Sequence, residues 1–449
     1  MFFTYIWPLI SFIMARIIGR TGERSLLKMA LNTDKSELIA VYGRRRVGKT
    51  YLIRETYKGR IKFELTGLHN GTLKDQLANF HQRLSEKGHK FKRPSSWLEA
   101  FAHLERFISN QKTKKKKVIF IDEFPWLASR RSKFLMAFES FWNSYASART
   151  DLVVVICGSA ASYMVRKIIR NRGGLHNRVT QRLRLLPFNL HETQLFLKSK
   201  NIRYSSYDIL QIYMAIGGIA QYLEHLRVGE SVAQAVDRLC FVKDAPLKTE
   251  FLDIFASLFD NSERHSAIVR ALGKSRRGFT RREISEKTKV KTGGALTRAL
   301  SELEESGFIE KFPAYGHVKK NALYRLIDEY SLFYLNFIEN ASAKSSWLKR
   351  FNSQAFKVWS GFSFETVCLK HVEQIKLALG ISSVSSENYS WTEKGTKTGA
   401  QIDLLISRND NVINLCEMKF YNAPFTISKR YAVEIRNKID LFQRSTQTS

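Results

Sequence analysis

Cysteine is scarce in this 449-residue chain. Its four cysteines, Cys157, Cys240, Cys368 and Cys416, lie far apart and form no CxxC pair or cysteine–histidine spacing. This absence argues against a zinc site and against a disulfide framework. The same absence fits a protein of the reducing cytoplasm.

Long apolar runs are also lacking. The apolar stretch at residues 2–13 is interrupted by Pro8 and is shorter than the roughly 20 residues needed to span a bilayer. No Lys or Arg precedes it and no small-residue cleavage site follows it, as a signal peptide would require. Met14 opens MARIIGRTGERSLL, which is typical of a natural start. We expect residues 1–13 to be an overcalled gene start or a frayed extension, with a membrane segment as the less favoured alternative.

Acidic residues are few relative to basic ones. The chain has 41 Asp and Glu residues against 73 Lys and Arg residues, so its formal net charge is +32. Hydrophobic residues make up 44% and charged residues 25%, a globular balance that argues against disorder. The positive surplus favours a polyanionic partner, either nucleic acid or an acidic membrane face. A lysine-rich surface without such a partner is the alternative.

The length allows two to four domains, and the N-terminal part has the pattern of an α/β domain. Strands of near-continuous Val and Ile, separated by helical segments, indicate a parallel sheet covered on both faces. The predicted strands lie at 38–43, 118–122 and 151–159, and the predicted helices at 72–85, 95–109 and 133–148. Residues 205–260 have helical patterns only. We therefore predict one α/β domain over residues 14–260, with a helical lid at its end.

A phosphate-binding loop follows the first predicted strand. The sequence GRRRVGKT matches GxxxxGK[ST] between a strand and a helix, where backbone N–H groups can surround a phosphate at the helix N-terminus. Lys49 is expected to neutralise the β- and γ-phosphates, and Thr50 to offer its hydroxyl to Mg²⁺. The predicted nucleotide-binding segment is Gly43, Arg44, Arg45, Arg46, Val47, Gly48, Lys49, Thr50 and Tyr51.

The second predicted strand, VIFID, ends in the acidic pair Asp122-Glu123. Asp122 at the carboxyl end of a strand can hold Mg²⁺ through water. Glu123 can polarise the attacking water, so it predicts hydrolysis in addition to binding. An acidic pair that only caps the strand is the structural alternative.

Two further polar residues are candidates for the same site. Ser159 ends the third predicted strand, where it could sense the γ-phosphate between the two phosphate motifs; an ordinary turn is the alternative. Arg178 is a candidate arginine finger that acts in trans or across the lid. A solvated basic face is an equally good interpretation of Arg178 and its neighbours Arg170, Arg172, Arg182 and Arg184.

These motifs resemble those of the archaeal-type ATPases of the AAA-like P-loop class. The resemblance rests on GRRRVGKT, FIDEFPWL, CGSA and the later LPF run, and it covers about residues 14–443. It implies ATP as the nucleotide. It also implies a winged helix and a C-terminal domain of uncharacterised function.

Residues 262–327 have the pattern of a winged helix-turn-helix. Helical patterns at 263–273, 280–288 and 293–306 precede two short strands, FIEKF and NALYRLI. The predicted apolar face consists of Ile284, Leu296, Leu300 and Leu303, and outside it lie Lys287, Lys289, Lys291, Thr297 and Arg298. That placement fits phosphate contacts by a recognition helix, to which the wing could add His317, Lys319 and Lys320. Protein docking or a rigid spacer is the alternative, and residues 328–350 are expected to form one aromatic core helix.

The C-terminal part combines two carboxylates and a lysine. Predicted strands near 382–391, 400–407 and 411–420 lie between a helix and a final helix at 427–443. A hairpin symmetric about Asp410 would place Asp403 opposite Glu417, close enough to share a divalent metal ion. Lys419 could orient or deprotonate a water, and Glu365 could complete the metal shell.

This arrangement resembles the PD-(D/E)xK restriction-endonuclease-like fold, with Asp403, Glu417 and Lys419 as its site. A charged hairpin held by a cross-strand salt bridge is the alternative. The fold has a further core strand after the final helix, whereas this sequence ends in QRSTQTS. We therefore expect a shortened domain with an exposed sheet edge.

The combined prediction is a cytoplasmic ATPase of three parts. A P-loop NTPase with parallel sheet and helical lid is expected over 14–260, a winged helix and connecting helix over 261–350, and a small α/β nuclease-like domain over 351–449. ATP and Mg²⁺ are the expected cofactors and DNA the expected partner, with a protein partner or a second copy also open. The alternative function is a nucleotide-dependent switch that recruits a protein and cuts nothing; an ATPase at a membrane surface is a third, less favoured hypothesis.

Overall fold

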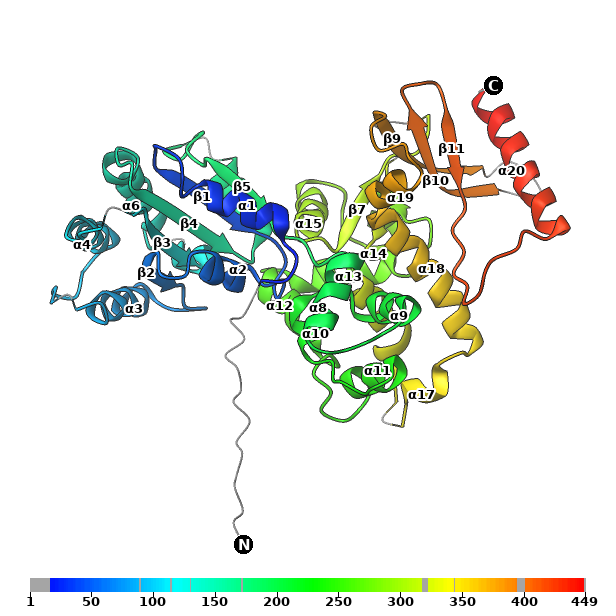
Figure 1. The fold of residues 1–449 in the computed structure, drawn as a ribbon, viewed down its shortest axis with the longest axis horizontal. Helices are drawn as coiled ribbons and strands as arrows, with labels where there is room; N and C mark the ends of the chain where they lie inside the picture. The colour runs from blue at the N-terminus through cyan, green and yellow to red at the C-terminus, as the bar shows by residue number, and fades with distance from the viewer. Residues whose placement is uncertain are drawn as a thin grey trace, which may run out of the picture. The chain divides into compact units, whose positions relative to one another are not determined.

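The protein is described here by a computed structural model that covers residues 17–88, 90–113, 115–129, 131–170, 173–316, 322–342, 344–393 and 400–447. The chain forms two compact units, with the boundary between Leu186 and Pro187 (Figure 1). Residues 1–13, which we expected to be an extension, lie outside the described part of the chain. The domain limits expected at residues 14, 261 and 351 stay predictions.

A five-stranded parallel sheet forms the centre of the first unit. Its strands are β1 (Glu37–Tyr42), β2 (Ile61–Thr66), β3 (Lys117–Asp122), β4 (Leu152–Gly158) and β5 (Gln181–Arg184). They are ordered β2-β3-β4-β1-β5, and each neighbouring pair is parallel. The three predicted strands are confirmed as β1, β3 and β4. Because β4 lies between β1 and β3, the loop after β1 and the acidic pair after β3 are separated by one strand.

Sequence patterns missed the two outer strands of this sheet. β2 has only two fully buried positions, Phe63 and Leu65, in an otherwise half-exposed segment. β5 has the sequence QRLR, in which only Leu183 is buried. Edge strands carry polar residues because one of their sides is open to solvent, so neither segment has the continuous apolar run of a central strand.

The helices of the first unit include the three predicted ones. The predictions at 72–85 and 95–109 are confirmed as α3 (Leu73–Ser85) and α4 (Trp97–Ser109), and that at 133–148 as α6 (Phe134–Phe141) with the π-helix η1 (Trp142–Ala146). The remaining helical segments are α1 (Thr21–Met29), α2 (Lys49–Thr56), α5 (Phe124–Leu127), α7 (Ala161–Tyr163) and η2 (Met164–Ile169).

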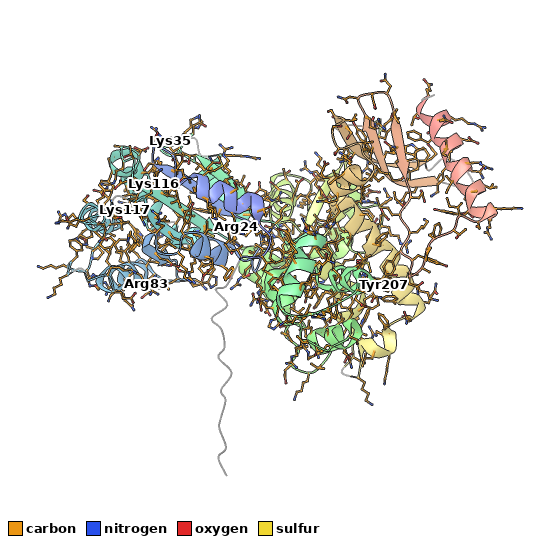
Figure 2. The ribbon with its side chains drawn as sticks, viewed as in Figure 1. Arg24, Lys35, Arg83, Lys116, Lys117 and Tyr207 are labelled. Carbon is orange, nitrogen blue, oxygen red and sulfur yellow. The ribbon has the colours of Figure 1, made fainter. Side chains whose placement is uncertain are left out.

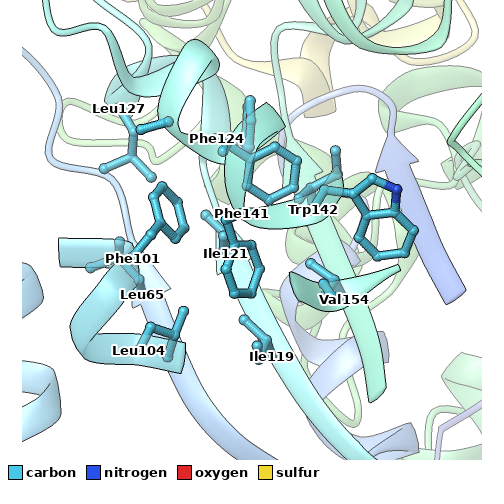
Figure 3. Close-up of a cluster of buried hydrophobic side chains, with 14 of the residues drawn as sticks. Leu65, Phe101, Leu104, Ile119, Ile121, Phe124, Leu127, Phe141, Trp142 and Val154 are labelled. Carbon is cyan, nitrogen blue, oxygen red and sulfur yellow. The ribbon is translucent and has the colours of Figure 1, made fainter. Parts of the chain in front are cut away.

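An aromatic cluster packs between the sheet and these helices (Figure 3). Phe101 from α4 lies with its ring centroid 5.1 Å from that of Phe141, and Phe124 lies 5.1 Å from Phe138. Phe124 directly follows the acidic pair at the end of β3 and is fully buried. Buried aromatic residues contribute large apolar areas to a core. The core therefore holds the chain immediately after Asp122 and Glu123.

Part of the basic surplus has a structural role. Lys116, labelled in Figure 2, donates hydrogen bonds from Nζ to the Ala30 carbonyl at 3.0 Å, Thr33 Oγ1 at 2.8 Å and the Lys35 carbonyl at 2.6 Å. Its neighbour Lys117 is 3% exposed and pairs with Asp151. These two lysines are thus bound within the first unit, so they cannot be counted as surface for a polyanion.

The second unit begins with helices, as predicted for residues 205–260. They are α8 (Leu190–Ser199), α9 (Ser206–Ile216), α10 (Ala220–Glu224), α11 (Val232–Cys240) and α12 (Glu250–Leu258). Ser205 caps α9 by accepting from the Asp208 N–H, while Asp208 accepts in return from the Ser205 N–H. Across the residues that the structure describes, no helix has both the length and the apolar character needed to cross a membrane.

The three helices and two strands predicted for 262–327 follow in the predicted order, and a short strand that was not predicted lies between the first two helices. The helices are α13 (Ser262–Leu272), α14 (Arg281–Thr288) and α15 (Gly294–Glu305), and the strands are β6 (Phe279–Thr280), β7 (Ile309–Phe312) and β8 (Leu323–Leu326). The sheet order is β6-β8-β7. The predicted apolar face is buried at Ile284, Leu296, Leu300 and Leu303. The predicted wing residues His317, Lys319 and Lys320 fall outside the described residues.

The prediction of one helix over 328–350 is wrong. The segment forms α16 (Glu329–Phe333), the π-helix η3 (Tyr334–Ile338) and a separate α17 (Trp347–Arg350). The intervening ENASAKSS has no apolar residue larger than Ala, so a helix there would bury nothing. Asp237 of α11 accepts from the Trp347 N–H at 2.5 Å and thereby fixes the new start. The expected core packing of the aromatic residues is nevertheless observed at Tyr330, Phe333, Tyr334 and Phe337.

The C-terminal part contains α18 (Gln354–Lys370), α19 (Val372–Ala378), β9 (Ser386–Glu393), β10 (Ala400–Arg408), β11 (Ile413–Cys416) and α20 (Lys429–Thr446). Its antiparallel sheet has the order β11-β10-β9. Leu404 pairs with Cys416 and Leu405 with Leu415, which is the predicted register. The predicted strand 411–420 is too long, because β11 ends at Cys416. Among the described strands β11 is an edge of this sheet.

The ion pairs of Asp151 predict a pH dependence of stability. Burial opposes ionisation of Asp151, but hydrogen bonds from Arg149 and Lys117 outweigh it and lower the pKa of the carboxyl to about 2. Because this folded-state pKa lies below the unfolded value of about 4, the stabilisation is present above pH 4 and is lost as the pH falls toward 2. Asp151→Asn should therefore lower the free energy of unfolding at neutral pH, and the difference should shrink in denaturant titrations below pH 4. A difference that stays constant with pH would contradict the assignment.

Candidate functional site

The phosphate loop has a backbone that requires glycine at two positions. Gly43 has φ of 146° and Gly48 has φ of 91°. A Cβ atom on Gly43 would lie 2.2 Å from the carbonyl oxygen of Leu185, which is too close for any other residue. The Leu185 N–H donates to the Tyr42 carbonyl at 2.8 Å. The segment after β5 thus packs directly against the start of the loop, and only glycine fits there.

Lys49 begins α2 and is 6% exposed. Its Nζ donates to the carbonyl oxygens of Gly43 at 3.0 Å and Arg44 at 2.8 Å, so the ammonium group lies across the loop. Burial lowers the pKa of Lys49, while the nearby carboxylates of Asp122 and Glu123 oppose that shift. A buried ammonium group held by two carbonyl oxygens is a binding group for phosphate oxygens.

The other residues of the predicted nucleotide segment differ in their exposure. Val47 and Arg44 are buried, whereas Tyr51 on α2 is 45% exposed. Arg45 and Arg46 are half-buried, and Arg46 has φ of 71°. Nucleotide contacts by these side chains stay predictions.

Thr50 and Asp122, the two predicted magnesium ligands of this unit, are brought together. The Thr50 hydroxyl donates to Asp122 Oδ2 at 2.7 Å. Asp122 is 4% exposed, and its Oδ1 accepts from the Glu123 N–H at 2.9 Å. Two oxygen ligands at a phosphate loop fit Mg²⁺, which usually keeps several waters and binds phosphates with one or two protein ligands. These two residues would hold the ion beside the nucleotide.

Glu123 and Ser159 form a second contact at the same edge of the sheet. The Ser159 hydroxyl donates to Glu123 Oε1 at 2.8 Å, and its N–H donates to Oε2 at 3.3 Å. Glu123 has φ of 45° and ψ of 46°, a left-handed conformation that is uncommon for residues other than glycine. The contact with Ser159 orients the carboxylate that we predict to activate water. Ser159 is therefore placed against the acidic pair, as its position at the end of β4 suggested.

Cys157 was not identified from the sequence as part of this region. It lies one residue before the end of β4 and is fully buried. Burial and the nearby Asp122 raise the pKa of its thiol. The residue is thus a neutral packing group next to Asp122. The only sequence signal was its place in the apolar run DLVVVICGS.

Arg178 is not brought to the nucleotide site of its own chain. It is exposed and precedes β5 by three residues. The Thr180 N–H donates to the Leu38 carbonyl near the start of β1, whereas the phosphate loop follows the end of β1. Since β1 and β5 are parallel, Arg178 lies at the opposite edge of the sheet. Its action in trans stays a prediction.

A second candidate site lies in the C-terminal part. A cavity of about 540 Å³ is lined by Asp403, Glu417, Lys419 and Glu365, the four residues predicted to form a site there. Other lining residues, which the sequence analysis did not name, include Arg276, Glu434 and Lys438. The cavity therefore contains side chains of both charges.

Three groups contact the carboxylate of Glu417. Lys438 from α20 lies 2.7 Å from Oε1, and Lys419 and the Tyr431 hydroxyl each lie 3.3 Å from Oε2. Burial lowers the pKa of Lys419, but Glu417 and Tyr431 outweigh it and raise that pKa. Lys419 is thus a fixed cation that can orient a substrate, which argues against its predicted alternative role as a base. Glu417 and Lys419 lie beyond the end of β11, so the chain after the hairpin carries them and not the strand itself.

Asp403 lies beside this group. Its Oδ2 accepts from the Met418 N–H at 2.9 Å, which fixes the carboxylate next to the chain after β11. Burial and the charge of Glu417 raise the pKa of Asp403. A cation between the two carboxylates would favour their ionised forms. Asp403 and Glu417 are oxygen ligands suitable for Mg²⁺.

The expected completion of this metal shell by Glu365 is not supported. Arg325 Nη2 donates to Glu365 Oε1 at 2.8 Å, and both side chains are buried. The guanidinium group already neutralises the carboxylate. Among the residues that the structure describes, no group of three or more His, Cys, Asp or Glu side chains is arranged to hold a metal ion.

The sheet order, the loop after β1 and the acidic pair after β3 define the fold of a P-loop NTPase. In agreement, residues 19–226 match the sequence model of a family described as an ATPase domain predominantly from Archaea. The predicted resemblance to archaeal-type ATPases is thus confirmed for this region. The match does not reach residues 227–449, so the winged helix and the nuclease-like domain stay predictions.

Individual proteins show similarity over more of the chain. An uncharacterized protein of Methanocaldococcus jannaschii, MJECL04, is 25% identical over 403 residues, which are 88% of this chain and 84% of that protein. The Walker-type ATPase PABY2304 of Pyrococcus abyssi has a similar fold, with a TM-score of 0.51 and 19% identity over 71% of this chain and 96% of that chain. The ORC2 protein of Aeropyrum pernix, solved as ADPNP–ADP complexes, has a TM-score of 0.45 and 15% identity, with 76% of this chain and 96% of that chain covered.

The buried Arg325–Glu365 pair predicts a strong effect on stability. Arg325→Ala should lower the free energy of unfolding by about 3–5 kcal/mol, because it leaves a carboxylate buried without its partner. The double variant Arg325→Met with Glu365→Leu should recover most of that loss in denaturant titrations. If the double variant were as unstable as Arg325→Ala, the loss would come from packing and not from the unpaired charge.

Proposed function

We propose that this protein is an AAA-like ATPase that binds and hydrolyses ATP with Mg²⁺ and engages DNA through its second unit. One observation carries the ATPase part of the proposal. The phosphate loop with Lys49 and Thr50, the pair Asp122-Glu123 and the residue Ser159 meet at one edge of the sheet through bonds of 2.7–2.8 Å. These groups come from three separate strand ends, so their meeting requires the whole fold.

Each group has a chemical role in this proposal. Lys49 binds the β- and γ-phosphates, and Thr50 and Asp122 hold the ion beside them. Mg²⁺ supplies neutralisation of the charge on the phosphates. Glu123 accepts a proton from the attacking water or orients it, and Ser159 keeps its carboxylate in place. The match of residues 19–226 to an ATPase family favours ATP as the nucleotide.

The DNA part of the proposal rests on the elements at 262–326 and on charge. Three helices with a three-stranded antiparallel sheet are the elements of a winged helix. Lys289, Lys291 and Arg298 are exposed at and before the start of α15, where a recognition helix contacts DNA. Arg281 Nη2 donates to the Gly293 carbonyl at 3.0 Å and supports the turn before that helix. Cations at this position can bind phosphates.

The C-terminal cavity supports a nuclease-like role. Asp403 and Glu417 line one cavity with Lys419 as a fixed cation, as a metal-assisted attack on a phosphodiester requires. The proposal is supported by the register of the hairpin, in which Leu404 lies opposite Cys416, next to Asp403 and Glu417 in the sequence. Cleavage is the activity that this arrangement supports best.

Two substitutions separate nucleotide binding from hydrolysis. Lys49→Ala should weaken ATP binding by roughly 10- to 100-fold, because it removes charge-assisted bonds to phosphate. Glu123→Gln should keep binding and lower kcat by about 10²- to 10⁴-fold, because it removes the group that activates water. Binding of a fluorescent ATP analogue and phosphate release measure the two effects.

Lys58→Ala is the matched control for this pair, since Lys58 is an exposed lysine that follows α2. It should leave both measurements unchanged. Wild-type turnover by Glu123→Gln would refute the role of Glu123. Unchanged ATP binding by Lys49→Ala would refute the site itself.

A second pair of substitutions tests cleavage. Asp403→Ala with Glu417→Ala should abolish Mg²⁺-dependent nicking of supercoiled DNA, because it removes both candidate ligands. Asp410→Ala, at the exposed turn of the same hairpin, should retain it. If wild-type protein gives no nicking under any metal condition, the second unit has the alternative role of a docking module. Nicking that survives the double substitution would belong to another site.

A further inference from the structure

A second cavity lies beside the carboxylate cavity and has a different composition. Its volume is about 480 Å³, and it is lined by the turn after α13, by η3 and by α18. Three cations line it, namely Arg270, Lys274 and Arg276, against one carboxylate, Glu339. Arg270 Nε pairs with Glu339 at 2.5 Å. The cavity therefore has an excess of positive charge from Lys274 and Arg276, both of which are exposed.

The apolar part of this cavity is aromatic. Trp359 and Phe362 on α18 line it together with Leu335. Trp359 is 3% exposed and is packed among other aromatic rings, including Phe333 at 5.3 Å between centroids. Trp359 is therefore enclosed in the core, and Phe362, which is half-buried, is the lining ring that a base can reach. A planar apolar ring next to cations binds nucleotides of a single strand through stacking of the base and pairing of the phosphate.

Trp359 also has an unused hydrogen-bond donor. Its Nε1 is buried and has no hydrogen-bond partner among the residues that the structure describes. A buried indole N–H usually finds an acceptor. Because this atom has no exposed surface, it belongs to the interior behind the cavity and is not itself a contact for the ligand.

Arg276 joins the two cavities. It lines both the aromatic cavity and the cavity of Asp403, Glu417 and Lys419. Its Nη2 donates to the Val358 carbonyl of α18 at 3.3 Å, which places the guanidinium group against that helix. A cation between two cavities can bind the phosphate that links a nucleotide in one cavity to its neighbour in the other.

We propose that the aromatic cavity binds one unpaired nucleotide of a single-stranded nucleic acid, whose linking phosphate is held by Arg276 beside the carboxylate cavity. Its volume lies in the range of about 300–1,000 Å³ typical of small-ligand sites. A base within a duplex is stacked and paired, so it cannot enter such a pocket without leaving the helix. The inference rests on the proposed DNA function and adds the substrate class: a single-stranded end or flap.

The test measures binding of the full chain to three labelled strands of equal length by fluorescence anisotropy over a salt series. The strands are an oligothymidylate, the same backbone without bases, and a blunt duplex. Wild-type protein should bind the oligothymidylate about tenfold more tightly than the abasic strand, as stacking of one base allows.

Arg276→Ala should weaken binding of the oligothymidylate by about fivefold to tenfold. It should also reduce the slope of log affinity against log salt by about 0.7, the value for one phosphate of a single strand. Binding of the duplex should stay unchanged. The matched control is Arg83→Ala, which removes the same charge from an exposed residue of α3 in the first unit.

Phe362→Leu tests the aromatic part, since it removes the half-buried ring and keeps an apolar side chain. It should reduce the preference for the oligothymidylate over the abasic strand. A thermal melt identifies any loss of fold, and in that case Lys274→Ala at the exposed rim is the replacement variant, with weaker binding of the oligothymidylate expected.

The outcomes separate this inference from the function on which it rests. Equal binding of thymidylate and abasic strands, or equal losses for single strand and duplex in Arg276→Ala, would overturn the nucleotide cavity while DNA binding stands. Binding of none of the three strands by wild-type protein would refute the DNA function itself. In every variant the rate of ATP turnover without DNA should match that of the wild type, because the substituted residues lie outside the proposed ATP-binding site.

Discussion

The hydrogen bond between Thr50 and Asp122 is the constraint on which the nucleotide site depends. Its two residues follow strands β1 and β3, which are separated by β4. The bond therefore forms only when all three strands are in register and when the chain after β3 is held in place. Phe124, fully buried in the aromatic core, provides that hold. Packing of the core and placement of the acidic pair are thus one structural requirement.

The same edge of the sheet carries a local conformational cost. Glu123 has a left-handed backbone, which costs free energy for a residue with a Cβ atom. Two hydrogen bonds from Ser159 offset part of that cost and fix the direction of the carboxylate. The position of Ser159 at the end of the central strand β4 explains why one residue can contact the acidic pair of the neighbouring strand.

Continuous apolar runs and glycine-containing motifs were predictable from the sequence. They identified β1, β3, β4 and the phosphate loop, because these segments are buried on both faces or need a special backbone. The edge strands β2 and β5 lack such runs. The absence of large apolar residues in ENASAKSS was visible in the sequence, but the start of the next helix at Trp347 also depends on Asp237 of a distant helix.

The candidate sites show the same division between local and tertiary information. Hairpin symmetry correctly gave the register of Leu404 with Cys416, but the ladder ends there, and the backbone N–H of Met418 holds Asp403 next to the chain after β11. Pairing of Glu365 with Arg325 joins residues 40 positions apart, and no local pattern predicts such a partner. Arg178 was chosen for its residue type, whereas its distance from the phosphate loop follows from the direction of β5. Net charge alone likewise overstates the number of cations available to a polyanion, because Lys116 and Lys117 form a hydrogen bond and an ion pair within the first unit.

The Arg325–Glu365 pair also has a mechanical consequence. Arg325 belongs to β8 of the small antiparallel sheet, and Glu365 belongs to α18. Any hinge motion between these two elements would separate the two opposite charges. Each charge would then be buried without its partner in an interior of low dielectric constant, which costs much free energy. We therefore expect the three-helix part and α18 to move together as one rigid body. The side chains of these elements that line the two cavities, such as Arg276 and Glu365, would then keep their relative positions when this part of the chain moves.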